Sequence, residues 1–218
     1  MLRLAAARIQ GALGVVDDDC DSLEGRAHDC INVIRTGSHD VETMLLKSSA
    51  FEKVLVEYGK DSKLAALEEQ EGCSVSEALA RRALLFGKLR WLAVRNAWSV
   101  PFEKKFSPWR FADPAVWQFD QDDLYASFAA EVLGISPEDV AGLVSALPKA
   151  DPWAIIQGHD AITILAIGLR TVLGSVQISD TNLAKALRLA FDVAAFRSTA
   201  LHDSVMAWQL TNQPYVIL

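Results

Sequence analysis

The chain has 218 residues, of which 51% are hydrophobic and 22% are charged, and this balance excludes an intrinsically disordered protein. Its net charge of −7 argues against broad electrostatic binding to nucleic acid, but still allows an enzyme that meets phosphates through a metal and a local basic patch. The three cysteines show no CxxC spacing, which favours reduced thiols in a cytoplasmic protein. No signal peptide and no membrane-spanning stretch is predicted.

Two short strands are predicted early in the chain, after a helix over residues 1–10. The apolar, β-branched run at 12–16 follows a glycine, and residues 31–36 form a second run of this kind. A polar loop over residues 20–30 joins them. If the strands are parallel neighbours, their crossover has about a dozen residues, which is near the minimum for such a connection.

From residue 40 onward the hydrophobic pattern changes to a period of 3.6 residues, which predicts a succession of helices. We expect one or two helices over 41–58, a polar helix over 60–70, and a long helix over 77–98 that Ser76 caps and whose basic face is solvated. The proline-rich and aromatic residues 99–119 predict an ordered loop with a short strand or two. Further helices are predicted at 122–133, 137–147, 159–173, 180–192 and 198–211, and a terminal strand at 215–218.

Strands that precede a run of helices predict the overall class of the fold. We expect an α/β protein with a small parallel-sheet lobe over residues 1–60. A larger, mainly helical lobe then covers residues 61–218.

Four aspartates follow the first predicted strand within five positions, Asp17, Asp18, Asp19 and Asp21. The carboxyl end of a strand is where α/β sheets place their active sites. Carboxylates held close together repel one another until a divalent cation relieves the repulsion. The cluster therefore predicts a Mg²⁺ (or Mn²⁺) site, and a solvated acidic turn is the competing interpretation.

A second polar cluster closes the second predicted strand and leads into a helix, from Thr36 to Glu42. If the strands are parallel, both clusters face one crevice, where Asp40 and Glu42 can complete a metal shell or transfer protons. The competing interpretation is a helix cap, in which Ser38 or Asp40 accepts first-turn amides and Glu42 favours the helix dipole.

All four histidines are followed by aspartate, a doublet that ligates metal in HD-type phosphohydrolases. This keeps open an alternative in which His28, His39 and Asp40 share a metal. The later Asp160 follows Gly158 at a predicted helix start, so it is first a capping candidate.

The segments 14–21 and 32–42 resemble the DxD strand of a Toprim (topoisomerase–primase) domain and the strand that follows it. The resemblance is closest to Toprim-like proteins of unknown function that are related to the OLD-family nucleases. These proteins occur in bacterial anti-phage systems, often beside an ATPase partner. Residues 158–160 and the helical tail also look like that group.

The second strand of that group ends in Thr-Asp, two residues before a His-Asp-x-Glu signature. In this chain Gly37 replaces the first aspartate of that pattern. The matching positions are Thr36, His39, Asp40 and Glu42.

The resemblance implies a metal-dependent phosphodiester hydrolase, with Asp17 and Asp19 holding the metal and Asp21 nearby. Toprim chemistry also uses a glutamate on an earlier strand, and residues 1–16 contain no Asp or Glu. Either Glu42 or Glu24 substitutes for it, or the chain is amino-terminally truncated, or it is a non-catalytic interaction or regulatory subunit. The expected partners are a nucleic acid substrate, an ATPase protein and a second copy of the chain.

Overall fold

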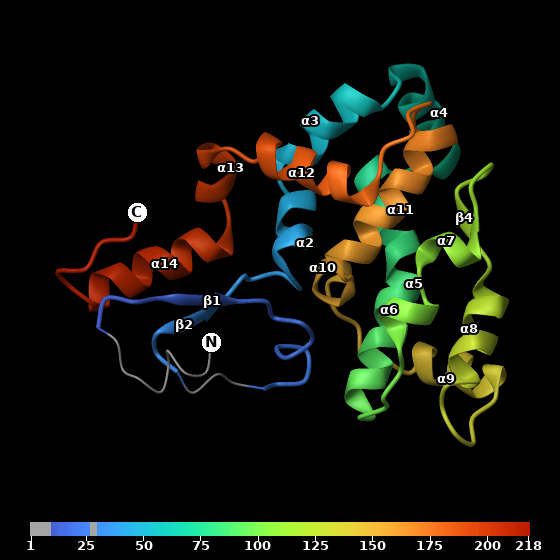
Figure 1. The fold of residues 1–218 in the computed structure, drawn as a ribbon, viewed down its shortest axis with the longest axis horizontal. Helices are drawn as coiled ribbons and strands as arrows, with labels where there is room; N and C mark the ends of the chain where they lie inside the picture. The colour runs from blue at the N-terminus through green and yellow to red at the C-terminus, as the bar shows by residue number, and fades with distance from the viewer. Residues whose placement is uncertain (1–9, 27–29) are drawn as a thin grey trace.

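Two short strands form the sheet that opens the described part of the chain, β1 (Gly14–Val16) and β2 (Val33–Arg35). In this computed structural model, which describes residues 10–26 and 30–218, they pair in parallel with Val15 opposite Ile34. Because parallel strands end at the same edge of a sheet, the polar segments that follow them lie side by side (Figure 1). The predicted α/β class, a small parallel sheet followed by helices, is confirmed.

The longer helices lie close to their predicted ranges because their apolar positions repeat with helical spacing. The predicted helix over residues 1–10 falls, apart from its last residue, outside the described residues. The observed helices are α2 (Val41–Leu46), α3 (Ser49–Tyr58), α4 (Asp61–Glu71), α5 (Val75–Arg95), α8 (Gln121–Ala129), α9 (Pro137–Ser145), α11 (Gly158–Thr171), α12 (Asp180–Ala190) and α14 (Ala200–Thr211).

Helix α5 begins two residues earlier than predicted, so the expected cap at Ser76 is wrong. The Ser74 hydroxyl accepts the Glu77 amide at 3.2 Å, and the Glu77 carboxylate accepts the Ser74 amide at 2.9 Å. This reciprocal capping box uses the Ser-x-x-Glu spacing, which Ser76 lacks. The signal for the true start was therefore present in the sequence.

Several elements are too short for periodicity to detect. The proline-rich segment contains two short strands, as predicted, which pair antiparallel, and it also contains short helices that were not predicted. The predicted terminal strand at 215–218 is wrong, because Gln209 Oε1 instead accepts the backbone amide of Leu218 at 2.6 Å. The short elements are α6 (Phe102–Lys105), α7 (Pro108–Phe111), α10 (Pro152–Ile155), α13 (Val193–Arg197), β3 (Ala112–Asp113) and β4 (Gln118–Phe119).

Helices α5 and α11 lie side by side at the centre of the helical part (Figure 1). Trp117 is fully buried against them, and its indole Nε1 donates to the Ile164 carbonyl at 2.8 Å. Arg82 lies 4.2 Å over the Trp117 ring and donates to the Trp117 carbonyl at 2.6 Å. Arg82 and Arg90 of α5 are largely buried and paired with carboxylates, so the prediction of a solvated basic face is wrong there.

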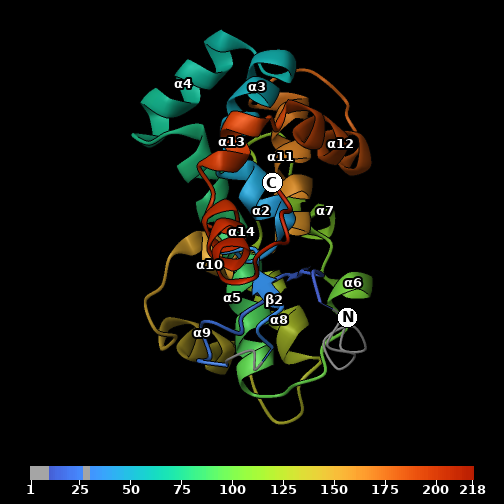
Figure 2. The ribbon, with the colours of Figure 1, turned by 90° about the vertical axis from the view of Figure 1, so that its left-hand side faces the viewer.

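Hydrophobic contacts continue across residue 60, the predicted boundary between the lobes. Leu45 and Phe51, from α2 and α3, belong to the same buried cluster as α11 and α12. At the other end of the chain, α14 returns to lie against the strand pair, where Leu201 packs with Met44 and Ile34 (Figures 1 and 2). Within the described residues, no helix combines the length and the apolar character needed to cross a bilayer.

Close packing of α5 on α10 predicts that any side chain at Gly87 destabilises the protein. A Cβ at this position would lie 2.6 Å from the Ile155 carbonyl oxygen, a backbone atom that cannot swing away. We expect Gly87→Ala to lower the free energy of unfolding by about 1–3 kcal/mol, as overpacking does. Urea denaturation measures this loss.

The matched control is Gly142→Ala in α9, where a Cβ would lie within 4 Å of no atom beyond its own stretch of helix in residues 10–26 and 30–218. This variant should gain about 0.5–1 kcal/mol, because alanine favours helix interiors. Equal stability of Gly87→Ala and the natural chain would contradict the α5–α10 contact.

Candidate metal-binding site at the strand tips

Backbone hydrogen bonds join the ends of the two strands. The amides of Asp18 and Asp19 both donate to the His39 carbonyl, at 3.0 and 2.9 Å. Gly37, where the Toprim-like pattern has an aspartate, has a φ of +74°, and a Cβ there would lie 2.7 Å from the Ala200 Cβ. A left-handed backbone pressed against α14 favours glycine. The two tips therefore form one fixed unit.

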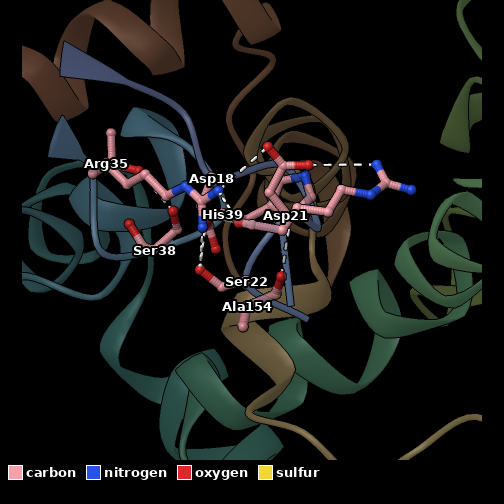
Figure 3. A network of polar contacts seen from close by, with 9 residues as sticks. Asp18, Asp21, Ser22, Arg35, Ser38, His39 and Ala154 are labelled. Carbon is pink, nitrogen blue, oxygen red and sulfur yellow. Dashed lines mark hydrogen bonds and ion pairs between the residues drawn. The ribbon is translucent and has the colours of Figure 1, made fainter. Parts of the chain in front are cut away.

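An arginine on β2 binds two of the four clustered aspartates (Figure 3). Arg35 Nη1 lies 3.0 Å from the buried Asp18 carboxylate, and Arg35 Nη2 lies 3.5 Å from that of Asp21. Ser22 donates to Asp18 at 2.7 Å and accepts from Arg35 at 2.8 Å. Asp21 also pairs with Arg26 at 3.4 Å. Asp18 and Asp21 thus fold the turn after β1 onto the end of β2.

The buried Asp40 carboxylate links the strand tips to two helices. Its Oδ1 accepts the Thr43 amide at 2.8 Å as the N-cap of α2, and its Oδ2 accepts the Gly158 amide of α11 at 2.7 Å. Burial raises the pKa of Asp40, and the two amides and the nearby His39 oppose that shift. Of the two predicted caps, Asp40 is confirmed. Ser38 instead donates to the Asp40 carbonyl, at 3.1 Å.

Asp17 is the place where carboxylates from the two tips repel one another. Partial burial raises its pKa, and the negative charges of Asp40, Asp19 and Glu42 raise it further. Glu42 itself lies 2.7 Å from the Arg188 guanidinium. Among residues 10–26 and 30–218, Asp17 and Asp19 form no ion pair, and no three His, Cys, Asp or Glu side chains converge as a metal site.

Mg²⁺ in proteins is commonly held by one or two carboxylates while it keeps several waters. Asp17 and Asp19 are the carboxylates of the strand tips to which the contacts above assign no partner among the described residues. Two such carboxylates fit an ion held in this way. Asp21, the third predicted ligand, lies among the arginines described above. Asp40 and Glu42, predicted to be catalytic, are close enough to affect Asp17 but are held by α11 and Arg188.

The His39-Asp40 doublet has a structural role in this fold. The buried His39 Nδ1 lies 3.1 Å from the Ala154 carbonyl (Figure 3), and both oxygens of Asp40 accept backbone amides. His28, the third residue of the HD-type alternative, lies outside the described residues. The geometry of the doublet therefore gives that alternative no support.

A cavity of about 600 Å³ beside the strand tips was not anticipated from the sequence. Arg90 in its wall binds Asp160 through two bonds, Nε to Oδ2 at 2.7 Å and Nη2 to Oδ1 at 3.1 Å. The predicted cap role of Asp160 is therefore wrong, and Gln157 occupies the N-cap position of α11 without a side-chain bond. The cavity is lined by Asp19, Cys20 and His39 from the strand side and by Arg90, Ala93, Val94, Ala97, Trp98, Ser99, Val100, Phe102 and Gln157 from the helical side.

The geometry defines an α/β protein with carboxylates on adjacent strand tips and a cavity beside them. Comparisons of the chain with protein-family models, with curated proteins and with solved structures find no match. The resemblance to Toprim-like proteins therefore rests on the sequence alone, at the two strand tips, residues 158–160 and the helical tail.

Loss of the Asp40 carboxylate should destabilise the protein more than loss of an ordinary cap. Asp40→Ala removes the α2 cap and leaves the buried Gly158 amide without its acceptor. The expected loss is about 2–4 kcal/mol, and Asp40→Asn should lose less because it keeps one acceptor oxygen. Urea denaturation gives both values.

The control is Ser136→Ala, which removes a cap of α9 worth about 1 kcal/mol. An equal loss of stability in Asp40→Ala and Ser136→Ala would refute the double role of Asp40.

Repulsion at Asp17 predicts that the neutral variant Asp17→Asn is more stable than the natural chain, by an amount that depends on pH. The pKa of Asp17 in the folded protein lies above its ordinary value of 3.8. The folded state therefore loses stability as the pH rises from that ordinary value through the raised pKa. Without divalent metal, Asp17→Asn should therefore be more stable at pH 7, by less than about 1 kcal/mol at this exposed position.

The gain from Asp17→Asn should disappear toward pH 3.5, where the natural carboxyl is itself largely protonated. Denaturation in EDTA across this pH range measures it, with the exposed Asp122→Asn as a control that should gain nothing. A less stable Asp17→Asn at pH 7 would show that Asp17 is not repelled by its neighbours.

Proposed function

We propose that this chain is a Toprim-like protein of the nuclease type, which uses Mg²⁺ (or Mn²⁺) to hydrolyse phosphodiesters in bacterial anti-phage defence. The observation that carries the proposal is the meeting of the two strand tips, where the amides of Asp18 and Asp19 both donate to the His39 carbonyl. The negative charges of Asp40, Asp19 and Glu42, from both tips, raise the pKa of Asp17 beyond the effect of its partial burial. A divalent cation is the ligand that relieves such repulsion.

Asp17 and Asp19 would hold the ion. When bound, the ion polarises a phosphoryl oxygen and lowers the pKa of a coordinated water. Asp40 would position the site, because its carboxylate fixes the β2 tip to α2 and α11. Glu42 is the candidate for proton transfer, since it lies on the first turn of α2 and its partner Arg188 is exposed to solvent.

A non-catalytic interaction or regulatory subunit is the second candidate. It is favoured by the internal contacts of Asp18, Asp21 and Asp40, which use acidic residues of the tips to hold the fold together. Such a subunit would act on an ATPase partner, a nucleic acid or a second copy of the chain. It requires no metal and no hydrolysis, so the two candidates differ in a measurable way.

Mn²⁺ binding, followed by water-proton relaxation or calorimetry, tests the metal site directly. We expect Asp17→Asn and Asp19→Asn each to weaken Mn²⁺ affinity by about tenfold or more, since each removes a charged ligand. Asp122→Asn, on the exposed start of α8, serves as the control and should bind like the natural chain.

Nuclease assays on single- and double-stranded DNA and RNA, with Mg²⁺ or Mn²⁺, then separate the two candidates. Cleavage that depends on Asp17 and Asp19 supports the hydrolase. Metal binding without cleavage favours the interaction subunit, and unchanged Mn²⁺ affinity in both variants would rule out the site.

A further inference from the structure

We propose that the cavity between the strand tips and the carboxyl end of α5 binds one unpaired adenine base of a nucleotide substrate. The inference deepens the proposed function and rests on it for the position of the phosphate. The base-binding step itself needs no metal, so it can be tested separately. The argument begins with the size and the walls of the cavity.

The size of the cavity, about 600 Å³, lies within the range of small-molecule sites. A nucleotide fits such a volume, whereas a base pair within a duplex does not. Its helical wall carries the aromatic rings of Trp98 and Phe102 beside Val100. Aromatic side chains in nucleic acid sites stack on unpaired bases. The walls therefore suit a flat, partly apolar group.

Gln157 gives the cavity a group that can recognise a base edge. This residue lines the cavity, and its Oε1 atom is buried with no hydrogen-bond partner among the described residues. A buried acceptor of this kind is destabilising until a donor reaches it. A carboxamide presents a donor and an acceptor side by side, the arrangement that pairs with the amino group and ring nitrogen of adenine.

The charge of Arg90 in the same wall is already balanced. Asp160 binds two of its nitrogens, and its guanidinium lies 4.5 Å from the centre of the Phe102 ring. The wall is therefore held rigid and close to neutral, which suits a base better than a phosphate. Asp19, on the opposite side, is both a cavity residue and a proposed metal ligand. A base in the cavity would thus place its phosphate toward the strand tips.

A second hollow, of about 410 Å³, shares Arg90, Phe102 and Gln157 with the first. It is lined by the paired Arg90 and Asp160, and by Glu103, His159 and Asp180. Glu103 and Asp180 disfavour a phosphate on this side, whereas a metal held by Asp17 and Asp19 would attract one on the other. With the metal bound, the phosphate of the nucleotide would therefore point toward Asp19 and not toward α12.

Ligand-observed NMR in EDTA tests the base site with adenosine, adenosine monophosphate, uridine monophosphate and inorganic phosphate. We expect adenosine to bind, and adenosine monophosphate to bind no more tightly because its phosphate meets Asp19 without the metal. Uridine monophosphate should bind about tenfold more weakly than adenosine monophosphate, and phosphate alone should not compete. Gln157→Leu should remove most of the preference for adenine. Val94→Trp should block binding, because Val94 lies on the cavity wall and is 39% exposed, so the larger ring can enter the cavity without overpacking the core.

Trp109→Leu is the matched control, since Trp109 stacks on Arg170 at 4.2 Å and does not line the cavity. It should bind adenosine monophosphate like the natural chain.

Absence of adenosine binding, equal affinity for the adenine and uracil nucleotides, or unchanged binding by Val94→Trp would each overturn the base site. These results are independent of Mn²⁺ affinity. A failed metal site with intact adenosine binding refutes the proposed function alone, and the reverse result refutes the base site alone.

Discussion

The Asp40 carboxylate is the contact on which the arrangement of this protein depends. It is buried, yet it accepts amides from α2 and from the start of α11, 118 residues further along the chain. A buried carboxylate is tolerated only when hydrogen bonds replace its lost hydration. Two strands of three residues are too short to form a stable sheet by themselves. The His39 carbonyl therefore joins the two strand tips, and Asp40 fixes them to the helices that support the sheet edge.

The acidic cluster divides into two groups with different surroundings. Asp18 is buried against Arg35, whereas its neighbours Asp17 and Asp19 are exposed. The chain turns sharply after β1, since Asp19 has a φ of +45° and the amides of Asp18 and Asp19 both donate to the His39 carbonyl. This turn leaves the Asp18 side chain buried against Arg35 and helps to expose Asp17 and Asp19. The run of aspartates thus combines a structural ion pair with two carboxylates that form no ion pair among the described residues, and neither interpretation of the cluster excludes the other.

The sequence predicts the strand pair and the meeting of its tips because both depend on short, local patterns. The Ser74-x-x-Glu77 cap is equally local, although the prediction places the cap at Ser76. The bonds from Asp40 to Gly158 and from Arg90 to Asp160 are different, because the residues that they join lie 118 and 70 positions apart, respectively. No periodicity encodes such contacts. The cavity escaped prediction for the same reason, since its walls come from segments that meet only in the folded chain.

The cover of the strand pair by α14 has a consequence for the order of folding. The strands lie within residues 14–35, but the helix that packs on them spans Ala200–Thr211. Contacts between such distant segments form late, because the closure of a long loop must precede them. During synthesis the strands leave the ribosome well before α14, and their apolar face stays unprotected until it arrives. The strand tips are therefore made before α14 and reach their final geometry only after it has formed.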